Sequence, residues 1–434
     1  ILWRLGLPPV DLSDPNNIYG KIADYKNCSR DGHKSGKLKV VILISTLGAG
    51  GSERQAVHLA LELKKRGVDI EILTLQTLVG PSAHFLPLLN EFKLRVTSVF
   101  ENSDSYFGHS SPTFFESNQR LPTPLTPSYK IANFIDKAKP DIIHSWLDET
   151  NIWGAIAGIM AGTPGIIMST RSVNPTQFSK KNAWTKHWYR ILLNNNHVAI
   201  INNSAFGARD YGKWLGIKPT RIEVINNGVI SDICGPFEER RNEENLHNKL
   251  GLRKENKIIL GVMRLSEEKR PLLFIRSCLS ILKMRPDSVC ILIGDGPMSE
   301  QVKKVVEKSG LKERMILLNA SKEVKNIMKI SDLLILTSRV EGSPNVLIEA
   351  QSSGCPVLTT AAGGAVDAIQ EGKTGFIIPA KPEKIAQKAC DILENKILQS
   401  SLRVAGPPFV RSTFGMDNMV TRTLNLYHRV LDLA

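Results

Sequence analysis

The sequence predicts an α/β protein made of two successive domains, each with a parallel sheet covered by helices on both faces. Two observations carry this prediction. Short apolar runs alternate with helix-compatible segments along most of the 434 residues, and a polar, charged stretch at 231–257 interrupts that alternation. Strands that alternate with helices are typical of parallel sheets. With 42% hydrophobic residues, a chain of this length can bury two large cores.

The first domain is predicted at 37–230, after an extension of unknown role at 1–36. Its predicted strands are the apolar runs 39–46, 70–75, 140–145, 165–169, 198–202 and 222–225. Helices are predicted at 53–66, 129–137, 152–161 and in a segment that runs through Trp214. The uncharged stretch 150–170 is long enough to span a bilayer. Gly162-Thr163-Pro164-Gly165 divides it, which favours a buried helix followed by a strand.

The second domain is predicted at 258–414, after a linker at 231–257. Its predicted strands are 258–262, 289–293, 315–318, 333–336, 357–359 and 375–378. A final helix is predicted at 415–434. The stretch 100–127 is rich in Ser, Pro and Asn and is predicted to be a long loop.

The charge of the chain limits the classes of ligand. Lys and Arg number 56 against 42 Asp and Glu, which gives a formal net charge of +14. Such a surface favours phosphate in nucleic acid, in anionic lipid or in a nucleotide. No nucleic-acid-binding motif accompanies the charge, so nucleic acid is the least favoured of the three. Six scattered cysteines without a Cys-x-x-Cys pair, and an opening at 1–10 without a signal-peptide layout, predict a cytoplasmic protein without structural zinc.

The segment 337–350 carries two glutamates around a predicted helix start. An apolar strand at 333–336 leads to Glu341, Ser343 is predicted as the N-cap, and Pro344 suits the first helical position. Glu349 then lies about a turn and a half into the helix. In open α/β sheets the crevice at the strand ends binds ligands, and a helix N-terminus there favours an anion such as a diphosphate. Any strand–loop–helix can carry two glutamates by chance, so this pattern alone also allows a purely structural reading.

The same segment resembles the Glu-x7-Glu motif of retaining glycosyltransferases with the GT-B fold, and is most similar to glycosyltransferase family four. The resemblance covers roughly 37–430. It implies two Rossmann-like domains that face a cleft, with the C-terminal helix crossing back to the first. It also implies that Glu341 lies beside the donor sugar and that Glu349 hydrogen-bonds the nucleotide ribose. The residues implied to hold the donor phosphates are Gly342, Ser343, Pro344, Asn345 and Val346.

Two further segments of the second domain resemble the family. The stretch 261–269 is similar to its Gly-Arg-Leu-x-x-x-Lys diphosphate site, which implies that Arg264 and Lys269 neutralise the departing diphosphate together. A solvated basic loop is the alternative for these two residues. The turn at 294–297 resembles the family's Gly-x-Gly-Pro turn and is interpreted as a fold marker. Gly364, in a glycine-rich turn after a strand, is implied to lie near the donor.

The loop 48–53 superficially resembles a dinucleotide-binding fingerprint. Its third glycine would have to stand where Glu53 stands, and the second strand ends without the acidic residue that holds a ribose. A dehydrogenase is therefore disfavoured. The resemblance instead implies that Gly50 and Gly51 cover the donor phosphates.

Four residues of the first domain are candidates for contacts with the sugar or the acceptor: His144, Asp148, Asn151 and Arg171. Many relatives carry His-x-His at 144–146, and this chain has Trp146 in place of the second histidine. His144 aligns with the first, more structural histidine. Asp148 and Asn151 are expected on the loop that follows.

The segment from Phe178 to Arg190 interleaves basic and aromatic residues. Such a helix suits the surface of an anionic membrane, where a lipid-linked acceptor would lie. A helix that packs its tryptophans on the core, with its lysines in water, gives the same pattern. The sequence leaves both open.

Together these features predict a retaining, metal-independent glycosyltransferase that needs no cofactor. The implied partners are a nucleotide sugar, expected to be UDP- or GDP-linked, and a glycan or lipid-linked acceptor. A non-catalytic protein that binds nucleotide sugars is the alternative from another functional class, and the retention of Glu341, Glu349, Arg264 and Lys269 argues against it.

Overall fold

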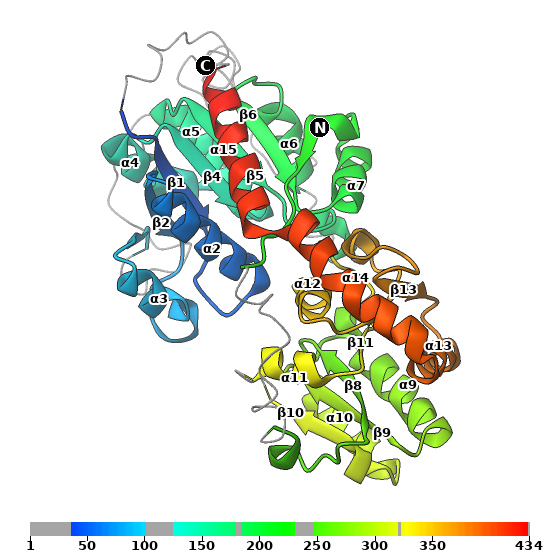
Figure 1. The fold of residues 1–434 in the computed structure, drawn as a ribbon. Coiled ribbons are helices and arrows are strands. Elements are labelled where there is room, and N and C mark those ends of the chain that lie inside the picture. The colour runs from blue at the N-terminus through cyan, green and yellow to red at the C-terminus, as the bar shows by residue number, and fades with distance from the viewer. Residues whose placement is uncertain (1–35, 101–124, 179–183, 231–245, 320–322, 433–434) are drawn as a thin grey trace. The chain divides into compact units, whose positions relative to one another are not determined.

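The computed structural model describes residues 36–100, 125–178, 184–230, 246–319 and 323–432. The chain divides into two compact units. The first unit comprises residues up to Gly228 together with those from Met419 onward, and the second runs from Val229 to Asn418. Each unit contains one sheet with helices around it, as the ribbon in Figure 1 shows. This confirms the predicted α/β class.

The first sheet is parallel throughout. Its strands lie in the order β3 (Arg95–Ser98), β2 (Asp69–Thr74), β1 (Lys39–Ile44), β4 (Ile142–Trp146), β5 (Gly165–Ser169), β6 (Val198–Asn202) and β7 (Ile222–Val224). From β1 the chain adds β2 and β3 on one side of the sheet, and from β4 it adds β5, β6 and β7 on the other side. The point between β1 and β4 is therefore the switch point, where the crevice at the strand ends opens.

The helices of this unit are α2 (Gly51–Lys65), α3 (Leu86–Glu91), α4 (Pro127–Ala138), α5 (Asp148–Ala161), α6 (Thr185–Leu192) and α7 (Ala205–Leu215). The uncharged stretch 150–170 is divided as predicted. Helix α5 ends at Gly162, whose φ of 71° lies in the left-handed region, and β5 follows. Among the described residues, no helix has both the length and the apolar character needed to cross a membrane.

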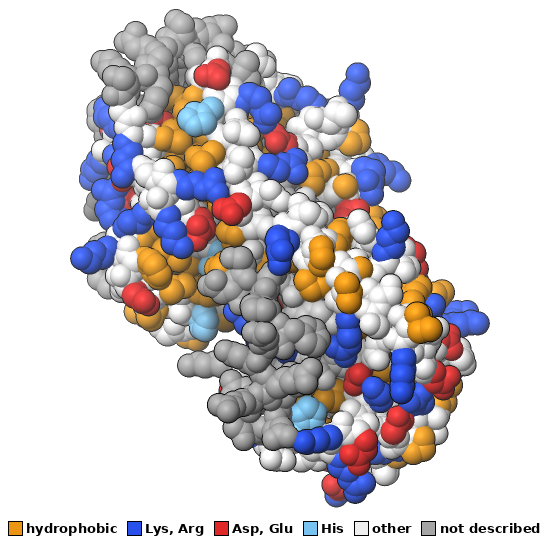
Figure 2. All heavy atoms as spheres, viewed as in Figure 1, with side chains coloured by type: hydrophobic (Ala, Val, Ile, Leu, Met, Phe, Trp, Pro, Cys, Tyr) orange, Lys and Arg blue, Asp and Glu red, His pale blue; other side chains and the backbone are white. Residues whose placement is uncertain are grey.

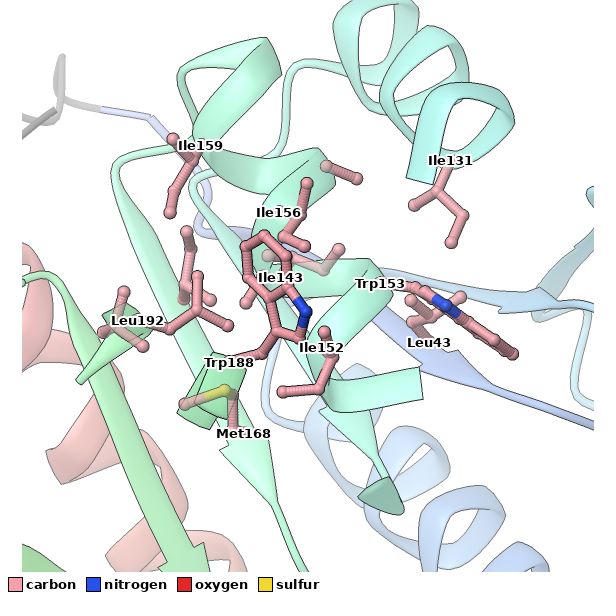
Figure 3. Packing of buried hydrophobic residues seen from close by; sticks show 14 of the residues in the cluster. Leu43, Ile131, Ile143, Ile152, Trp153, Ile156, Ile159, Met168, Trp188 and Leu192 are labelled. Atoms are coloured by element: carbon pink, nitrogen blue, oxygen red, sulfur yellow. The ribbon is translucent and has the colours of Figure 1, made fainter. Parts of the chain in front are cut away.

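The core of the first unit forms where α5 packs on the sheet. Ile143 of β4 and Ile152 and Ile156 of α5 are fully buried, and Figure 3 shows them around the indole of Trp188. The close packing depends on Gly154, because a Cβ at this position would lie 2.1 Å from the Ser145 hydroxyl and 2.7 Å from Leu43.

The second sheet repeats the same design. Its parallel strands lie in the order β10 (Met315–Leu318), β9 (Ser288–Ile293), β8 (Lys257–Val262), β11 (Leu333–Leu336), β12 (Val357–Thr360) and β13 (Gly375–Ile378). The switch point lies between β8 and β11. The helices that accompany it are α9 (Pro271–Met284), α10 (Ser299–Lys308), α11 (Val324–Ile330), α12 (Asn345–Ser352), α13 (Pro382–Glu394) and α14 (Lys396–Phe414).

The chain ends in helix α15 (Met416–Asp432), which begins just after Gly415. From Met419 onward this helix belongs to the first unit. Contacts that attach it there include Nδ1 of His144, 2.8 Å from the Tyr427 hydroxyl, the ion pair of Arg429 with Glu223, and the 3.0 Å hydrogen bond from Arg66 to the Thr421 hydroxyl. The predicted linker falls largely on 231–245, which lie outside the described residues.

Candidate active site

An ion pair lies at the switch point of the second sheet, where β8 and β11 are neighbours. Lys269, which follows β8, donates from Nζ to Oε1 of Glu341 over 2.6 Å. The Ser338 hydroxyl donates to the same oxygen over 2.6 Å. Glu341 is only 8% exposed, so its carboxylate is held in place from two sides. Two of the three residues predicted to be catalytic are thus in direct contact.

Arg270 fixes the loop after β8 onto the end of β11. Its Nε donates to the Thr337 carbonyl over 2.7 Å, and its Nη2 donates to the Ser338 carbonyl over 2.7 Å. Arg270 has φ 51°, a left-handed conformation that is costly for a residue other than glycine. Its side-chain hydrogen bonds hold it there, and Lys269 is positioned as a result. The sequence reasoning missed Arg270, whose only signal was its place between Lys269 and Pro271.

Arg264, the third predicted catalytic residue, is exposed on the loop after β8. The glycine turn after β9 supports this loop. Gly294 has φ 147°, and a Cβ there would lie 1.9 Å from the Met263 carbonyl oxygen. The Leu265 amide donates to the Asp295 carbonyl over 2.9 Å. The turn therefore sets the path of the loop that carries Arg264, as expected of a fold marker.

Helix α12 follows Glu341 and starts one residue later than predicted. Pro344 is the N-cap, with φ −74° and ψ 105°, and the helix begins at Asn345. The predicted N-cap role of Ser343 and first helical position of Pro344 are therefore wrong by one residue. Asn345 and Val346 supply the first two amides of the helix, which carry the positive end of its dipole. Glu349 lies on α12 and is partly buried.

The glycine-rich turn after β12 is brought beside Glu341. The Gly364 amide donates to the Glu341 carbonyl over 2.9 Å, and Gly364 is buried. Gly342 is buried at the same place. The two glycines therefore enclose the backbone of Glu341, while the side chain of Glu341 faces Lys269.

In the first unit, the loop after β1 carries Gly50 and Gly51. Gly50 is the N-cap of α2, and Gly51 is its first residue and is exposed. The glycines therefore stand at the strand end beside the switch point of the first sheet. Their predicted contact with donor phosphates stays a prediction.

His144 is a structural residue. It is fully buried on β4, and its ring lies 5.4 Å from the Trp146 ring and bonds Tyr427 of α15. Burial, with a smaller contribution from the nearby Arg171 charge, lowers the pKa of His144 to about 3. The imidazole is therefore neutral at physiological pH, and its main contact attaches the last helix.

Asp148 and Asn151 are not on a loop, as predicted, but in the first turn of α5. Helix α5 begins at Asp148 rather than at 152, and acidic residues in a first turn favour such a start. Asn151 is fully buried and bonds the Ser169 backbone in both directions, over 3.1 and 3.0 Å. Asn151 is therefore engaged within the fold, and its contact with a sugar stays a prediction.

The Asp148 carboxylate is engaged within the protein. Its Oδ1 accepts from the hydroxyls of Tyr189, over 2.9 Å, and Tyr211, over 2.7 Å. Burial raises the pKa of Asp148 to about 6, although both tyrosine hydrogen bonds act to lower it. Two of the four first-domain candidates keep buried polar atoms without a partner: Nε2 of His144, and Nε and Nη1 of Arg171. Arg171 follows β5 and lies over the Trp146 ring, 4.3 Å from the ring centroid.

Helix α6 turns its aromatic side chains to the core. Trp188 is 2% exposed and Tyr189 is fully buried, and Figure 3 shows Trp188 beside Met168 and Leu192. Of the two readings that the sequence left open, packing on the core holds for Trp188 and Tyr189, whereas Phe178 at the start of the segment is 53% exposed. Lys186 is partly buried and Arg190 is exposed. Lys180 and Lys181 lie outside the described residues.

On the one face that Figure 2 shows, the basic side chains of the described residues do not gather in one stripe. Lys and Arg are interspersed there with Asp, Glu and neutral side chains. This pattern gives no support to nucleic acid as a partner.

Comparison with known proteins defines the class. The Glycosyltransferase Family 4 profile matches residues 49–232, and the Glycosyl transferases group 1 profile matches 242–407. The structure has a TM-score of 0.73 with Alr3699/HepE from Anabaena, solved in complex with UDP and glucose, at 20% identity over 90% of this chain and 99% of that one. The protein is a GT-B glycosyltransferase.

Its family follows from the two profiles, which between them match both units: the chain belongs to glycosyltransferase family four, with a group 1 second half. It is 26% identical to the Vi polysaccharide biosynthesis protein VipC/TviE of Salmonella typhi over 88% of this chain and 70% of that protein. It is 30% identical to the UDP-Gal:alpha-D-GlcNAc-diphosphoundecaprenol alpha-1,3-galactosyltransferase of Escherichia coli over 58% of this chain and 65% of that protein. Its activity is therefore sugar transfer in the assembly of glycoconjugates.

Proposed function

We propose that the protein is a retaining glycosyltransferase that uses a UDP- or GDP-linked sugar and an acceptor hydroxyl on a growing glycan. The observation that carries this proposal is the Lys269–Glu341 ion pair at the end of β11, directly before helix α12. It places two groups side by side: a cation that can stabilise a departing phosphate and a carboxylate that can position the sugar. The complex of Alr3699/HepE with UDP and glucose supports a nucleotide-linked donor.

Donor binding is assigned to the second unit. Glu349 holds the ribose through its carboxylate. The first amides of α12, at Asn345 and Val346, face the diphosphate together with Lys269 and the exposed Arg264. Because the charges are fixed on strand ends and on a helix start, little reorganisation is needed when negative charge develops on the leaving group.

The reaction exchanges one bond at the anomeric carbon. The bond from this carbon to the donor phosphate oxygen breaks, and its electron pair leaves with the nucleoside diphosphate. The acceptor oxygen forms the new bond from the same face, and its proton passes to the departing phosphate oxygen. Glu341 positions the donor sugar and stabilises positive charge at the reacting carbon. Arg264 and Lys269 stabilise the diphosphate, so the proposed reaction uses neither a metal ion nor a cofactor.

The acceptor is proposed to be lipid-linked. The E. coli relative is named for a diphosphoundecaprenol-linked acceptor, which supports this class. Attachment to the membrane is proposed to be electrostatic only, because Trp188 and Tyr189 are buried in the core. Each basic residue near an anionic surface contributes about 1 kcal/mol.

Sedimentation with vesicles tests the membrane contact. The protein is expected to sediment with vesicles that contain acidic lipid, and much less with neutral ones. Replacing Lys180, Lys181, Lys186 and Arg190 with Ser should release it, as should high salt, because salt screens exposed charges. Binding that ignores both the salt and the substitutions would place the contact elsewhere.

Release of free nucleotide from a panel of nucleotide sugars tests the activity itself. One donor is expected to release its nucleoside diphosphate in the presence of a lipid-linked glycan, and the product linkage at the anomeric carbon is expected to be retained, by NMR. EDTA should leave the rate largely unchanged. Binding of a donor without any turnover on a range of acceptors would favour a non-catalytic protein, and an EDTA-sensitive rate restored by a divalent ion would refute the metal-free proposal.

A further inference from the structure

A cluster of buried polar side chains lies at the carboxyl ends of β4, β5 and β6 in the first unit. We call it the Arg171 cluster: Arg171, Trp146, His144, Asn203 and Asn227. Each of these five residues is at most 6% exposed, and Arg171, at 6%, is the most exposed of them. The carboxyl ends of parallel strands are where α/β sheets bind ligands.

Hydrogen bonds at its backbone carbonyl and at its guanidinium hold Arg171 in a strained backbone conformation. Its φ of 56° lies in the left-handed region, which residues other than glycine seldom adopt. The Asn203 amide donates to the Arg171 carbonyl over 3.0 Å, and Nη2 of Arg171 donates to the Asn227 side-chain oxygen. The guanidinium also stacks over Trp146. Such strain persists where the surroundings fix it, and it is concentrated at ligand sites.

Several polar atoms of this cluster have no hydrogen-bond partner. Within the described part of the chain, Nε and Nη1 of Arg171, Nε2 of His144, Nε1 of Trp146 and Oδ1 of Asn203 are buried without one, and the three nitrogens of Arg171 and Trp146 among them can only donate. Buried polar groups are nearly always bonded, so a group of orphaned atoms in one place requires an explanation. The partner that these three nitrogens lack is therefore an acceptor.

The charge of Arg171 requires the same partner. Among the described residues, no carboxylate forms an ion pair with Arg171. Burial lowers the pKa of Arg171 to about 9, so the side chain still carries its positive charge at neutral pH. A buried water molecule would accept hydrogen bonds but would leave the charge uncompensated. An anion would accept the hydrogen bonds and would also compensate the charge of Arg171.

We infer that the Arg171 cluster is a subsite for a single oxyanion on the sugar substrate, either a carboxylate or a phosphate. Arg171 supplies the charge, and the neighbouring indole N–H is available to the same anion. A buried site with one cation fits one acidic group rather than a polyanion. The inference rests on the proposed function in that it takes the ligand to be a sugar.

Binding to the full-length protein tests the inference. The probes are methyl α-D-glucuronide for a carboxylate, glucose 6-phosphate for a phosphate, and methyl α-D-glucoside as the neutral sugar, each titrated by ligand-observed NMR. One charged sugar is expected to bind about tenfold or more tightly than the neutral one, as charge-assisted hydrogen bonds are the stronger ones. Arg171→Gln should remove this preference, and Arg171→Lys should weaken it because it keeps only the charge.

The control variant is Arg209→Gln, which removes an exposed arginine from α7 and should keep the preference. UDP binding, assigned to the second unit, should be equal in all variants, and an unchanged thermal unfolding transition reports that the first unit is folded. If Arg171→Gln does not fold, the test relies on two other measurements. These are the binding preference of Arg171→Lys and the thermal shift of the unmodified protein with each sugar. A rise in Tm with a charged sugar but not with the neutral one supports the subsite, because a ligand stabilises only the state it binds.

Equal binding of charged and neutral sugars, or a preference that survives Arg171→Gln, would overturn the inference. The preference of phosphate over carboxylate, or the reverse, identifies the source of the oxyanion. Nucleotide release on the same preparations separates the two proposals. An intact preference without any release removes the proposed transferase reaction and keeps the anion subsite, whereas release without a preference does the opposite.

Discussion

The strand ends of the two parallel sheets differ in how their charged side chains are paired. At the ends of the second sheet, Lys269 and Glu341 form an ion pair, and Nε and Nη2 of Arg270 donate to acceptors. At the strand ends of the first, Arg171 keeps a buried charge that no described carboxylate balances. A site whose charges are paired in advance suits a ligand shared by a whole family, such as a nucleotide diphosphate. A site with an uncompensated charge suits a substrate particular to this chain.

The largest expected effect comes from breaking the paired site at Glu341. Glu341→Gln keeps the size of the side chain and an oxygen for Ser338, but removes the negative charge. Turnover should fall by about 100-fold or more, because a charge placed for the transition state is lost, while donor binding is kept. Steady-state nucleotide release, with UDP affinity measured in parallel, checks this. Glu267→Gln, on the exposed surface near Lys269, is the matched control. Near-normal turnover of Glu341→Gln would remove Glu341 from the mechanism.

The next effect tests the ribose contact. Glu349→Ala should weaken nucleoside diphosphate binding by about 1.5–3 kcal/mol, the range for a hydrogen bond to a charged group. Calorimetric titration with UDP and GDP measures the loss, and the free nucleoside should lose a similar amount because the ribose is present in both. Unchanged affinity for both ligands would refute the ribose role of Glu349.

A third measurement separates the phosphate from the rest of the donor. Lys269→Ala and Arg264→Ala should each weaken binding of the nucleoside diphosphate more than binding of the nucleoside, because both cations act on phosphate. Lys269→Ala should cost more, since it also leaves Glu341 buried without its cation, whereas Arg264 is exposed. Equal losses for the two ligands would point to damaged folding.

The smallest effect concerns the first unit and its dependence on pH. The folded-state pKa of Asp148, about 6, lies above the usual value near 4, so acidification between these values stabilises the folded unit. Asp148→Asn removes this gain. The variant should therefore be more stable than the unmodified protein above pH 7, by about 3 kcal/mol, because the pKa rises from 3.8 to about 6 and each pKa unit corresponds to about 1.4 kcal/mol; the advantage should be lost below about pH 4.

Urea unfolding followed across this pH range measures the difference between the two proteins. Titration of His144, whose lowered pKa acts in the opposite direction below about pH 6.5, is common to both and cancels. A difference in stability that does not change with pH would show that the Asp148 carboxylate titrates normally.

The sequence predicted the strands of both sheets well where they are apolar. The strands at β5, β6, β10, β11 and β13 lie where the apolar runs place them. The exception is β3, Arg95–Ser98, whose four residues are partly or fully exposed at the edge of the sheet. An edge strand with one polar face and few buried side chains has no apolar run to mark it.

The candidate site was predicted in its parts but not in its contacts. Lys269 and Glu341 were both expected near the donor, but their ion pair follows from β8 and β11 being neighbours, which no local pattern shows. Arg270 was missed because arginine rarely takes a left-handed φ, and only the fold requires it here. In α6, aromatic residues at helical spacing fit a core and a membrane surface equally well, so only packing places Trp188 inside.

Helix α15 has a consequence for how the protein is made. The last residues of the chain supply Tyr427, which bonds the buried His144 in the middle of the first unit. Domains usually fold as they leave the ribosome, N-terminal first. The first unit of this protein instead includes residues of α15, so its imidazole has no tyrosine partner until about 280 further residues, the second unit among them, have been synthesised. The first unit is therefore expected to be completed only after the second unit has been made.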